Sequence, residues 1–240
     1  VMGVLYNSRI VTDGLVSCVD AGDKMSYPGA GTTWTDLTKN NYNGTLENNA
    51  AFTSANAGGI AFDGTDDRVT INDFQDLDFT DASFSCGVKV DALGADRDFF
   101  VKGQHHGVAA IICWYDVTVG GGQQAGNSSA ISVLSYDGDT EMFISSSNNI
   151  ISAGEIFVVD VTIDASAGKI SLYKNAQLLV SYTNSNYDGM GNFSTNYYLG
   201  ADQDSNKDLQ GNIYFFRAYN KCLSASEVQQ NYNATKGRFG

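Results

Sequence analysis

The C-terminal part of the chain, residues 211–232, constrains the fold more than any other segment. Residues 213–219 are dense in aromatic and β-prone side chains, which predicts a strand. Ser224 and, three residues later, Glu227 have the spacing of a capping box, which predicts the start of a helix. We therefore expect a last strand followed by one short helix at the end of the chain.

Upstream of that segment, short apolar runs alternate with turn residues, and no other convincing helix is predicted. Apolar residues at every second position from Phe157 to Ile163 predict a strand that opens a hairpin. A tight turn is expected at Asn175–Ala176, where the lack of glycine predicts either a longer turn or mild strain. Further strands are predicted at 14–20, 59–64, 67–71, 84–90, 109–115 and 131–136. This pattern favours an all-β fold, a two-sheet antiparallel β-sandwich or jelly roll, with one short C-terminal helix.

Charge and hydropathy argue against two classes of partner. With 27 acidic and 14 basic residues the formal net charge is −13, so a nucleic-acid partner is not expected. The sequence has no apolar run of about 18 residues, so no membrane insertion is expected. Residues 1–9 are too short and polar for a signal peptide. Cys18, Cys86, Cys113 and Cys222 follow no metal-ligand spacing and are expected to be free thiols.

Six segments, in order along the chain, together resemble the laminin-G-like, or concanavalin A-like, lectin-glucanase superfamily. They are residues 14–21, 34–37 with 43–46, 62–67, 169–175, 198–200 and 211–232. The resemblance implies a single jelly-roll domain over residues 14–240, preceded by an N-terminal arm over residues 1–13. The arm is expected either to add to a neighbouring protein or to cover the domain's own edge.

Other segments resemble virion structural proteins of tailed bacteriophages, most of all the contractile-tailed phages of cyanobacteria. These segments are residues 9–15, 26–34, 223–234 and 236–240. The resemblance implies a virion location, in capsid, neck or tail, with other virion proteins as partners. Host-surface glycans are the implied ligands, held by weak sites that act in many copies, and a homo-oligomer is left open. Two alternatives stay open: a carbohydrate-binding module of a secreted enzyme, and a ligand-free capsid cement protein.

Catalytic residues are not expected. Retaining glycosidases need two carboxyl groups about 5–5.5 Å apart, and the related hydrolases carry a Glu-x-Asp-x-x-Glu pattern. None of the four glutamates here has an aspartate two residues later. His105 and His106 are adjacent in a predicted turn, so their side chains point apart and make a poor metal or catalytic pair.

Calcium is weighed and not favoured as a cofactor. Many members of the superfamily carry an acid directly after the isoleucine of the last strand, and here Tyr214 follows Ile213. Residues 63–67 are more simply read as a hydrogen-bonded turn. Candidate oxygen ligands are Asp20, Asp63, Asp66, Asp67, Asp202 and Asp204.

Sugar binding in this superfamily usually uses exposed aromatic rings, and Trp114 and Tyr115 are the candidates. They are adjacent in a predicted strand, so one of them is expected to face outward. A glycine-rich loop at 120–129 follows them and suits an exposed contact surface. Trp34 matches a superfamily position that packs in the core, and core packing remains the alternative for Trp114 and Tyr115.

Overall fold

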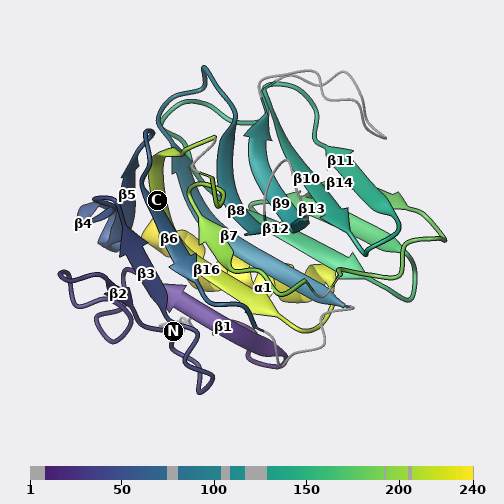
Figure 1. Cartoon of the computed structure of the whole chain (residues 1–240), viewed down its shortest axis with the longest axis horizontal. Coiled ribbons are helices and arrows are strands. Elements are labelled where there is room, and N and C mark those ends of the chain that lie inside the picture. Colours follow the sequence, from purple (N-terminus) through teal and green to yellow (C-terminus); the bar gives the residue numbers. More distant parts are fainter. Residues whose placement is uncertain are drawn as a thin grey trace, which may run out of the picture.

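The strands pair into two antiparallel sheets of eight strands each, which face one another as a sandwich (Figure 1). The structure is a computed structural model, and it describes residues 9–74, 81–103, 109–116, 129–191, 193–204 and 207–239. Residues 1–8 of the arm, the pair His105–His106 and residues 120–128 of the glycine-rich loop lie outside the described residues. The all-β jelly-roll prediction is confirmed.

The first sheet has the order β14-β13-β12-β7-β16-β5-β4, and β1 also pairs with β16. Strand β16 pairs with β7 along one edge, while β5 and β1 share its other edge. The strands are β1 (Leu15–Asp20), β4 (Ala51–Thr53), β5 (Gly59–Asp63), β7 (Ala82–Val90), β12 (Ile156–Asp164), β13 (Lys169–Lys174), β14 (Gln177–Thr183) and β16 (Gln210–Tyr219).

The second sheet has the order β11-β10-β9-β8-β15-β6-β3-β2. Its strands are β2 (Thr33–Trp34), β3 (Gly44–Glu47), β6 (Arg68–Ile71), β8 (Arg97–Gly103), β9 (Ala109–Asp116), β10 (Ala130–Tyr136), β11 (Glu141–Ser145) and β15 (Tyr197–Leu199). Strands β5 and β6 are consecutive in the chain but belong to different sheets, so the turn between them crosses from one layer to the other.

The core lies between the sheets and is filled by the alternating apolar positions of the strands. Phe157, Val159, Val161 and Ile163 of β12 all belong to it, as the two-residue periodicity predicted. Trp34 is 0% exposed in the same cluster, as expected for that position. Cys18, Cys86 and Cys113 are buried free thiols, and Cys222 is a half-buried one.

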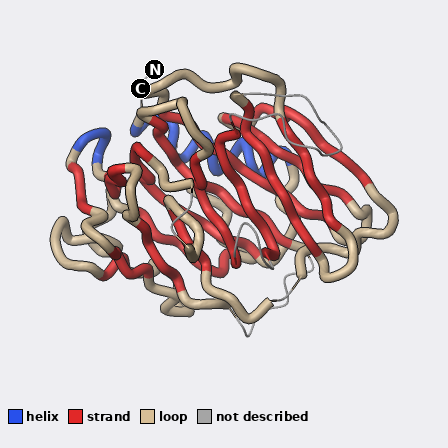
Figure 2. The backbone as a smooth tube through the Cα atoms, turned by 45° about the horizontal axis from the view of Figure 1, so that its top comes forward, coloured by secondary structure: helices blue, strands red, loops and turns tan. Residues whose placement is uncertain are grey.

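The predicted C-terminal helix is α1 (Ala225–Thr235), and it lies on the outer side of the first sheet (Figure 2). The capping box forms, because the Glu227 backbone N–H donates to Ser224 Oγ and the Ser224 backbone N–H donates to Glu227 Oε2. Val228 packs near Tyr219, and Tyr232 packs near Phe215. Short 3-10 turns are η1 (Ala55–Ala57) and η2 (Lys236–Arg238). In the described part of the chain no helix has the length and apolar character needed to span a membrane.

The described end of the N-terminal arm packs on this helix. Val11 is 7% exposed, and its backbone N–H donates to Asn231 Oδ1 at 2.8 Å. The Tyr219 hydroxyl donates to the Val11 carbonyl at 3.2 Å. Residues near Val11 therefore contribute to the domain's own surface, and docking of the arm on another protein stays a prediction.

The turn at Asn175–Ala176 resolves the choice between a longer loop and strain. Strand β13 ends at Lys174 and β14 begins at Gln177, so the loop has only these two residues. Their φ angles are 52° and 62°, the left-handed region that disfavours a Cβ atom. The hairpin therefore keeps its short loop and holds Ala176 in a strained conformation.

Candidate functional site

Trp114 and Tyr115 are neighbours in β9 and project from opposite faces of the second sheet. Tyr115 lies in the core at 0% exposure, and its hydroxyl donates to the Leu93 carbonyl at 3.3 Å. Trp114 lies on the outer face, where its ring packs 5.6 Å from that of Phe143, centroid to centroid. The Lys207 ammonium lies 5.3 Å from the Trp114 ring centroid, and Trp114 is only 4% exposed. Both rings are thus packed against protein, and their part in sugar binding stays a prediction.

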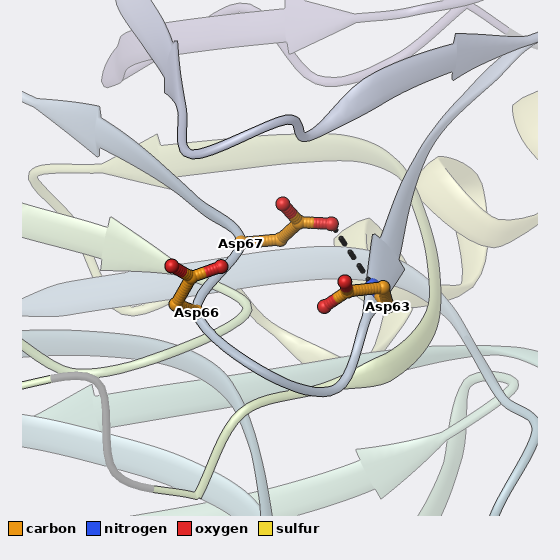
Figure 3. A group of neighbouring side chains, drawn as sticks. All are labelled: Asp63, Asp66 and Asp67. Carbon is orange, nitrogen blue, oxygen red and sulfur yellow. Dashed lines mark hydrogen bonds between the residues drawn. The ribbon is translucent and has the colours of Figure 1, made fainter.

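The acidic turn between β5 and β6 brings three candidate calcium ligands together (Figure 3). One carboxylate oxygen from each of Asp63, Asp66 and Asp67 lies within 4.8 Å of the other two. The Asp63 backbone N–H donates to Asp67 Oδ2 at 3.0 Å, and the Thr65 backbone N–H donates to Asp63 Oδ1 at 2.8 Å. These two hydrogen bonds are typical of a turn closed by aspartates, which is the favoured prediction for this segment.

The acidic turn has some chemistry that suits a cation. Asp67 is 3% exposed, and its Oδ1 is buried without a hydrogen-bond partner among the described residues. Burial raises the pKa of Asp67, and the charges of Asp63 and Asp66 raise it further. Carboxylate oxygens suit calcium, but Asp63 and Asp66 are exposed and two of the oxygens already accept backbone hydrogen bonds. The turn is explained by its own hydrogen bonds.

The other predicted acids divide between two places. Asp202 and Asp204 lie near the acidic turn, because Arg68, the residue after Asp67, donates from Nη1 to the Gln203 carbonyl at 2.7 Å. The Asp204 backbone N–H donates to Asp202 Oδ1 at 2.9 Å, as in another aspartate turn. Asp20 lies apart from this group and is 2.6 Å from the guanidinium of Arg238. The six predicted ligands therefore do not form one site.

A cavity that the sequence did not indicate lies between the loop 21–31 and residues 51–58. We call it the Phe52 hollow; its volume is about 210 Å³, and Tyr27, Pro28, Phe52, Lys24 and Ser54 are among its lining residues. A second cavity of about 340 Å³ adjoins it, because both are bordered by Gly22, Lys24 and Ala57. The two walls are separate in the sequence, and the pairing of β4 with β5 and of β5 and β1 with β16 brings them together.

Hydrogen bonds fix the loop that forms one wall of the Phe52 hollow. Ser26 is fully buried; its hydroxyl donates to the Thr35 carbonyl at 2.6 Å and accepts from the Asp20 backbone N–H at 3.0 Å. The Tyr27 hydroxyl donates to the Gly31 carbonyl at 2.5 Å. The wall is therefore part of the fold's hydrogen-bonded framework.

Arg238 holds the other wall of the hollow through several oxygen atoms. Its Nη1 donates to Asp20 Oδ1 at 2.6 Å, and its Nε donates to the Asn56 carbonyl at 3.3 Å. Its Nη2 donates to the carbonyls of Gly58 and, at 3.4 Å, Tyr214. One carboxylate and three backbone carbonyls thus converge on a single guanidinium, which is the kind of charge-assisted contact that arginine geometry favours.

Comparison with known proteins identifies the fold family. A laminin-G family model, described as concanavalin A-like lectin/glucanases superfamily, matches residues 63–229. This match covers more than half of the chain. The chain belongs to the concanavalin A-like lectin/glucanase superfamily. No curated protein matches this concanavalin A-like domain significantly.

Several solved structures share the fold of this concanavalin A-like domain at low identity. The binding domain of Paraclostridial mosquitocidal protein 1 matches with a TM-score of 0.67 and 14% identity, over 92% of this chain and 52% of that one. Trypanosoma rangeli sialidase matches with a TM-score of 0.66 and 14% identity, over 96% and 34%. Domain 4 of AbnA, a GH43 extracellular arabinanase from Geobacillus stearothermophilus in complex with arabinotriose, matches with a TM-score of 0.64 and 16% identity, over 91% and 98%. The chain thus spans about half of the first structure and a third of the second.

The last strand of this concanavalin A-like domain departs from the superfamily pattern at Tyr214. The resemblance implies an acid at this position, and the structure places the guanidinium of Arg238 there, 5.7 Å from the Tyr214 ring centroid. The Tyr214 hydroxyl accepts from Asn56 Nδ2 at 3.3 Å. A basic side chain of the protein itself therefore fills the space beside this strand.

Proposed function

We propose that this concanavalin A-like domain is a non-catalytic module, displayed on a bacteriophage virion, that binds glycans on the host surface. The observation that supports it best is membership of a superfamily that includes lectins. Domain 4 of the arabinanase, which this chain covers over 98% of its length, forms a complex with arabinotriose. A domain of the same size and fold is suited to hold a carbohydrate by itself.

The positions of the four glutamates support a non-catalytic role. Glu47 pairs with Arg68 at 2.6 Å, and Glu155 pairs with Lys174 at 2.5 Å. Glu227 serves the helix cap, and Glu141 is exposed at the start of β11. Glu227 and Asp13 bind the same Lys221 ammonium, at 2.9 and 2.8 Å, so contacts of the fold account for this pair of carboxylates as well.

The virion setting rests on the segments that resemble phage structural proteins. Two of them, residues 26–34 and 223–234, form the fixed loop beside the Phe52 hollow and most of helix α1. On a virion, many copies of a weak site act together, so a modest affinity per copy suffices for attachment. Other virion proteins would then be the partners of this domain.

Two measurements test the proposal. Multimerised protein should bind at least one class of surface polysaccharide on a glycan array and release no sugar from it on prolonged incubation. Labelled antibodies should locate the domain on intact phage particles by electron microscopy. Absence of binding to every glycan on the array would overturn glycan binding, and release of sugar would overturn the non-catalytic role. Absence from the particle would overturn the virion location.

A second candidate is a carbohydrate-binding module of a secreted carbohydrate-active enzyme. The match to a whole domain of an extracellular arabinanase favours it. Glycan binding is common to both candidates, whereas localisation on the particle separates them. A ligand-free cement protein would show the particle location without any glycan signal.

A further inference from the structure

We propose that the Phe52 hollow is the sugar-binding pocket and that it holds one neutral pyranose ring at the end of a glycan. This inference rests on the proposed function and gives the location of the glycan-binding site. The cavity of about 210 Å³ is smaller than the roughly 300–1,000 Å³ of pockets for drug-sized ligands. One ring fits this size, and the adjoining cavity of about 340 Å³ leaves room for the next sugar unit.

The aromatic floor of the hollow is rigid and partly open to solvent. The Phe52 ring stacks on the ring of Tyr27 with centroids 5.5 Å apart and planes at 26°. Tyr27 is 3% exposed and fixed through its hydroxyl to Gly31, whereas Phe52 is only partly buried. The accessible apolar surface therefore belongs to Phe52, and its supporting ring loses no freedom when a ligand binds.

Polar groups border this apolar floor in the way that a sugar requires. Lys24 and Ser54 are exposed at the edge of the hollow, and Asp23 lines the adjoining cavity. Lys24 forms no ion pair within the described part of the chain, so its ammonium is available as a donor. A few polar groups around an aromatic surface fix the orientation of a ligand that has both an apolar face and hydroxyl groups.

Local charge selects a neutral sugar over an acidic one. Asp20 and Asp23 both line the adjoining cavity, and the chain as a whole has a net charge of −13. The positive charge of Arg238 is already compensated by Asp20 at 2.6 Å. Asp23 and Lys24 are the other two charged residues of the lining, so acids and bases balance there and a carboxylated or sulfated glycan finds no excess of positive charge.

The wall opposite the loop carries backbone strain. Asn56 and Ala57 have φ angles of 51° and 63°, and Gly58 follows with 104°. Non-glycine residues in the left-handed region are strained and persist only where their surroundings hold them. Arg238 supplies that hold through the carbonyls of Asn56 and Gly58. Strain retained in a cavity wall is consistent with a preformed binding site.

The test compares three variants with the wild type on immobilised neutral polysaccharides, with acidic polysaccharides in parallel. Phe52→Ala removes the floor, and Ser54→Trp fills the hollow from an exposed position that does not disturb the core. Phe193→Ala is the matched control, because Phe193 is also half-buried and stacks on a tyrosine, Tyr136, at 5.8 Å and 7°. Thermal melting of each variant verifies that it is folded.

We expect both Phe52→Ala and Ser54→Trp to weaken binding to neutral polysaccharides about tenfold or more, with Phe193→Ala unchanged. Full binding by folded Ser54→Trp would overturn the pocket and leave the glycan-binding function intact. Preference for acidic polysaccharides would overturn the neutral-sugar assignment. Absence of wild-type binding to every polysaccharide would overturn both the pocket and the proposed function.

Discussion

Arg238 Nη1 lies 2.6 Å from Asp20 Oδ1, so the C-terminal turn is bound to the end of the first strand. The two side chains are only 12% and 19% exposed, which limits screening of the pair by solvent. Because the same guanidinium also binds the carbonyls of Asn56, Gly58 and Tyr214, it joins three separate segments.

Replacing Arg238 by alanine should lower the free energy of unfolding by about 2 kcal/mol, because Asp20 and the carbonyls lose a charged donor. Urea denaturation measures the change. Lys236→Ala is the control, since this exposed residue of the same turn should shift stability by less than about 0.5 kcal/mol. Equal effects of the two substitutions would contradict the role given to Arg238.

Stability should fall as the pH rises from about 4 to about 7, and Asp160 should be a main cause. Burial raises the pKa of Asp160 from 3.8 to about 7, against the opposing effects of Ser85 and Arg217. Between these values the folded protein binds more protons than the unfolded chain, so the free energy of unfolding decreases by up to about 1.4 kcal/mol per pH unit. Asp160→Asn should flatten this slope in urea titrations, and an unchanged slope would exclude Asp160 as the cause.

Ala176→Gly should stabilise the domain by about 0.5–1 kcal/mol. The φ angle of 62° at Ala176 strains its Cβ atom, and relief of that strain outweighs the added flexibility of the unfolded chain. Thermal melting with circular dichroism measures the effect. Ala165 lies in a turn and has no positive φ, so Ala165→Gly should destabilise the domain instead. A lower melting temperature for Ala176→Gly would show that the strain is compensated elsewhere.

Calcium or a chelator should leave the melting temperature unchanged. In the acidic turn, backbone N–H groups already bind Asp63 Oδ1 and Asp67 Oδ2, and Asp66 is exposed. Saturation a hundredfold above the Kd of a real site would add about 2.7 kcal/mol. A rise in the melting temperature with calcium but not magnesium, lost in Asp67→Asn, would instead establish a calcium site.

Local patterns in the sequence predicted much of the fold. The two-residue alternation of Phe157–Ile163 and the spacing of Ser224 and Glu227 each describe contacts within a few residues, and the structure contains both the strand and the cap. The lack of glycine at Ala176 likewise predicted either a longer turn or mild strain, and the structure has the strained turn. Such features depend on backbone preferences and need no knowledge of distant segments.

The candidate site was not predictable in the same way, because it depends on distant contacts. Alternation in β9 placed Trp114 and Tyr115 on opposite faces, but burial of Trp114 depends on Phe143 and Lys207 from other strands and loops. The walls of the Phe52 hollow meet because β1 and β5 both pair with β16 in the first sheet, and no residue spacing within either wall indicates a cavity. The ion pair of Arg238 with Asp20 was not predicted either, because the two residues are 218 positions apart in the sequence.

The central place of β16 in the first sheet has a consequence for biosynthesis. This strand is synthesised after β1, β5 and β7, yet all three of them need it as a partner. The earlier strands therefore wait with unpaired edges until translation of the domain is nearly complete, a period in which they are exposed to association with other chains. Nascent chains halted before Gln210 should accordingly require chaperones, and release of residues 210–219 from the ribosome should trigger folding of the sandwich.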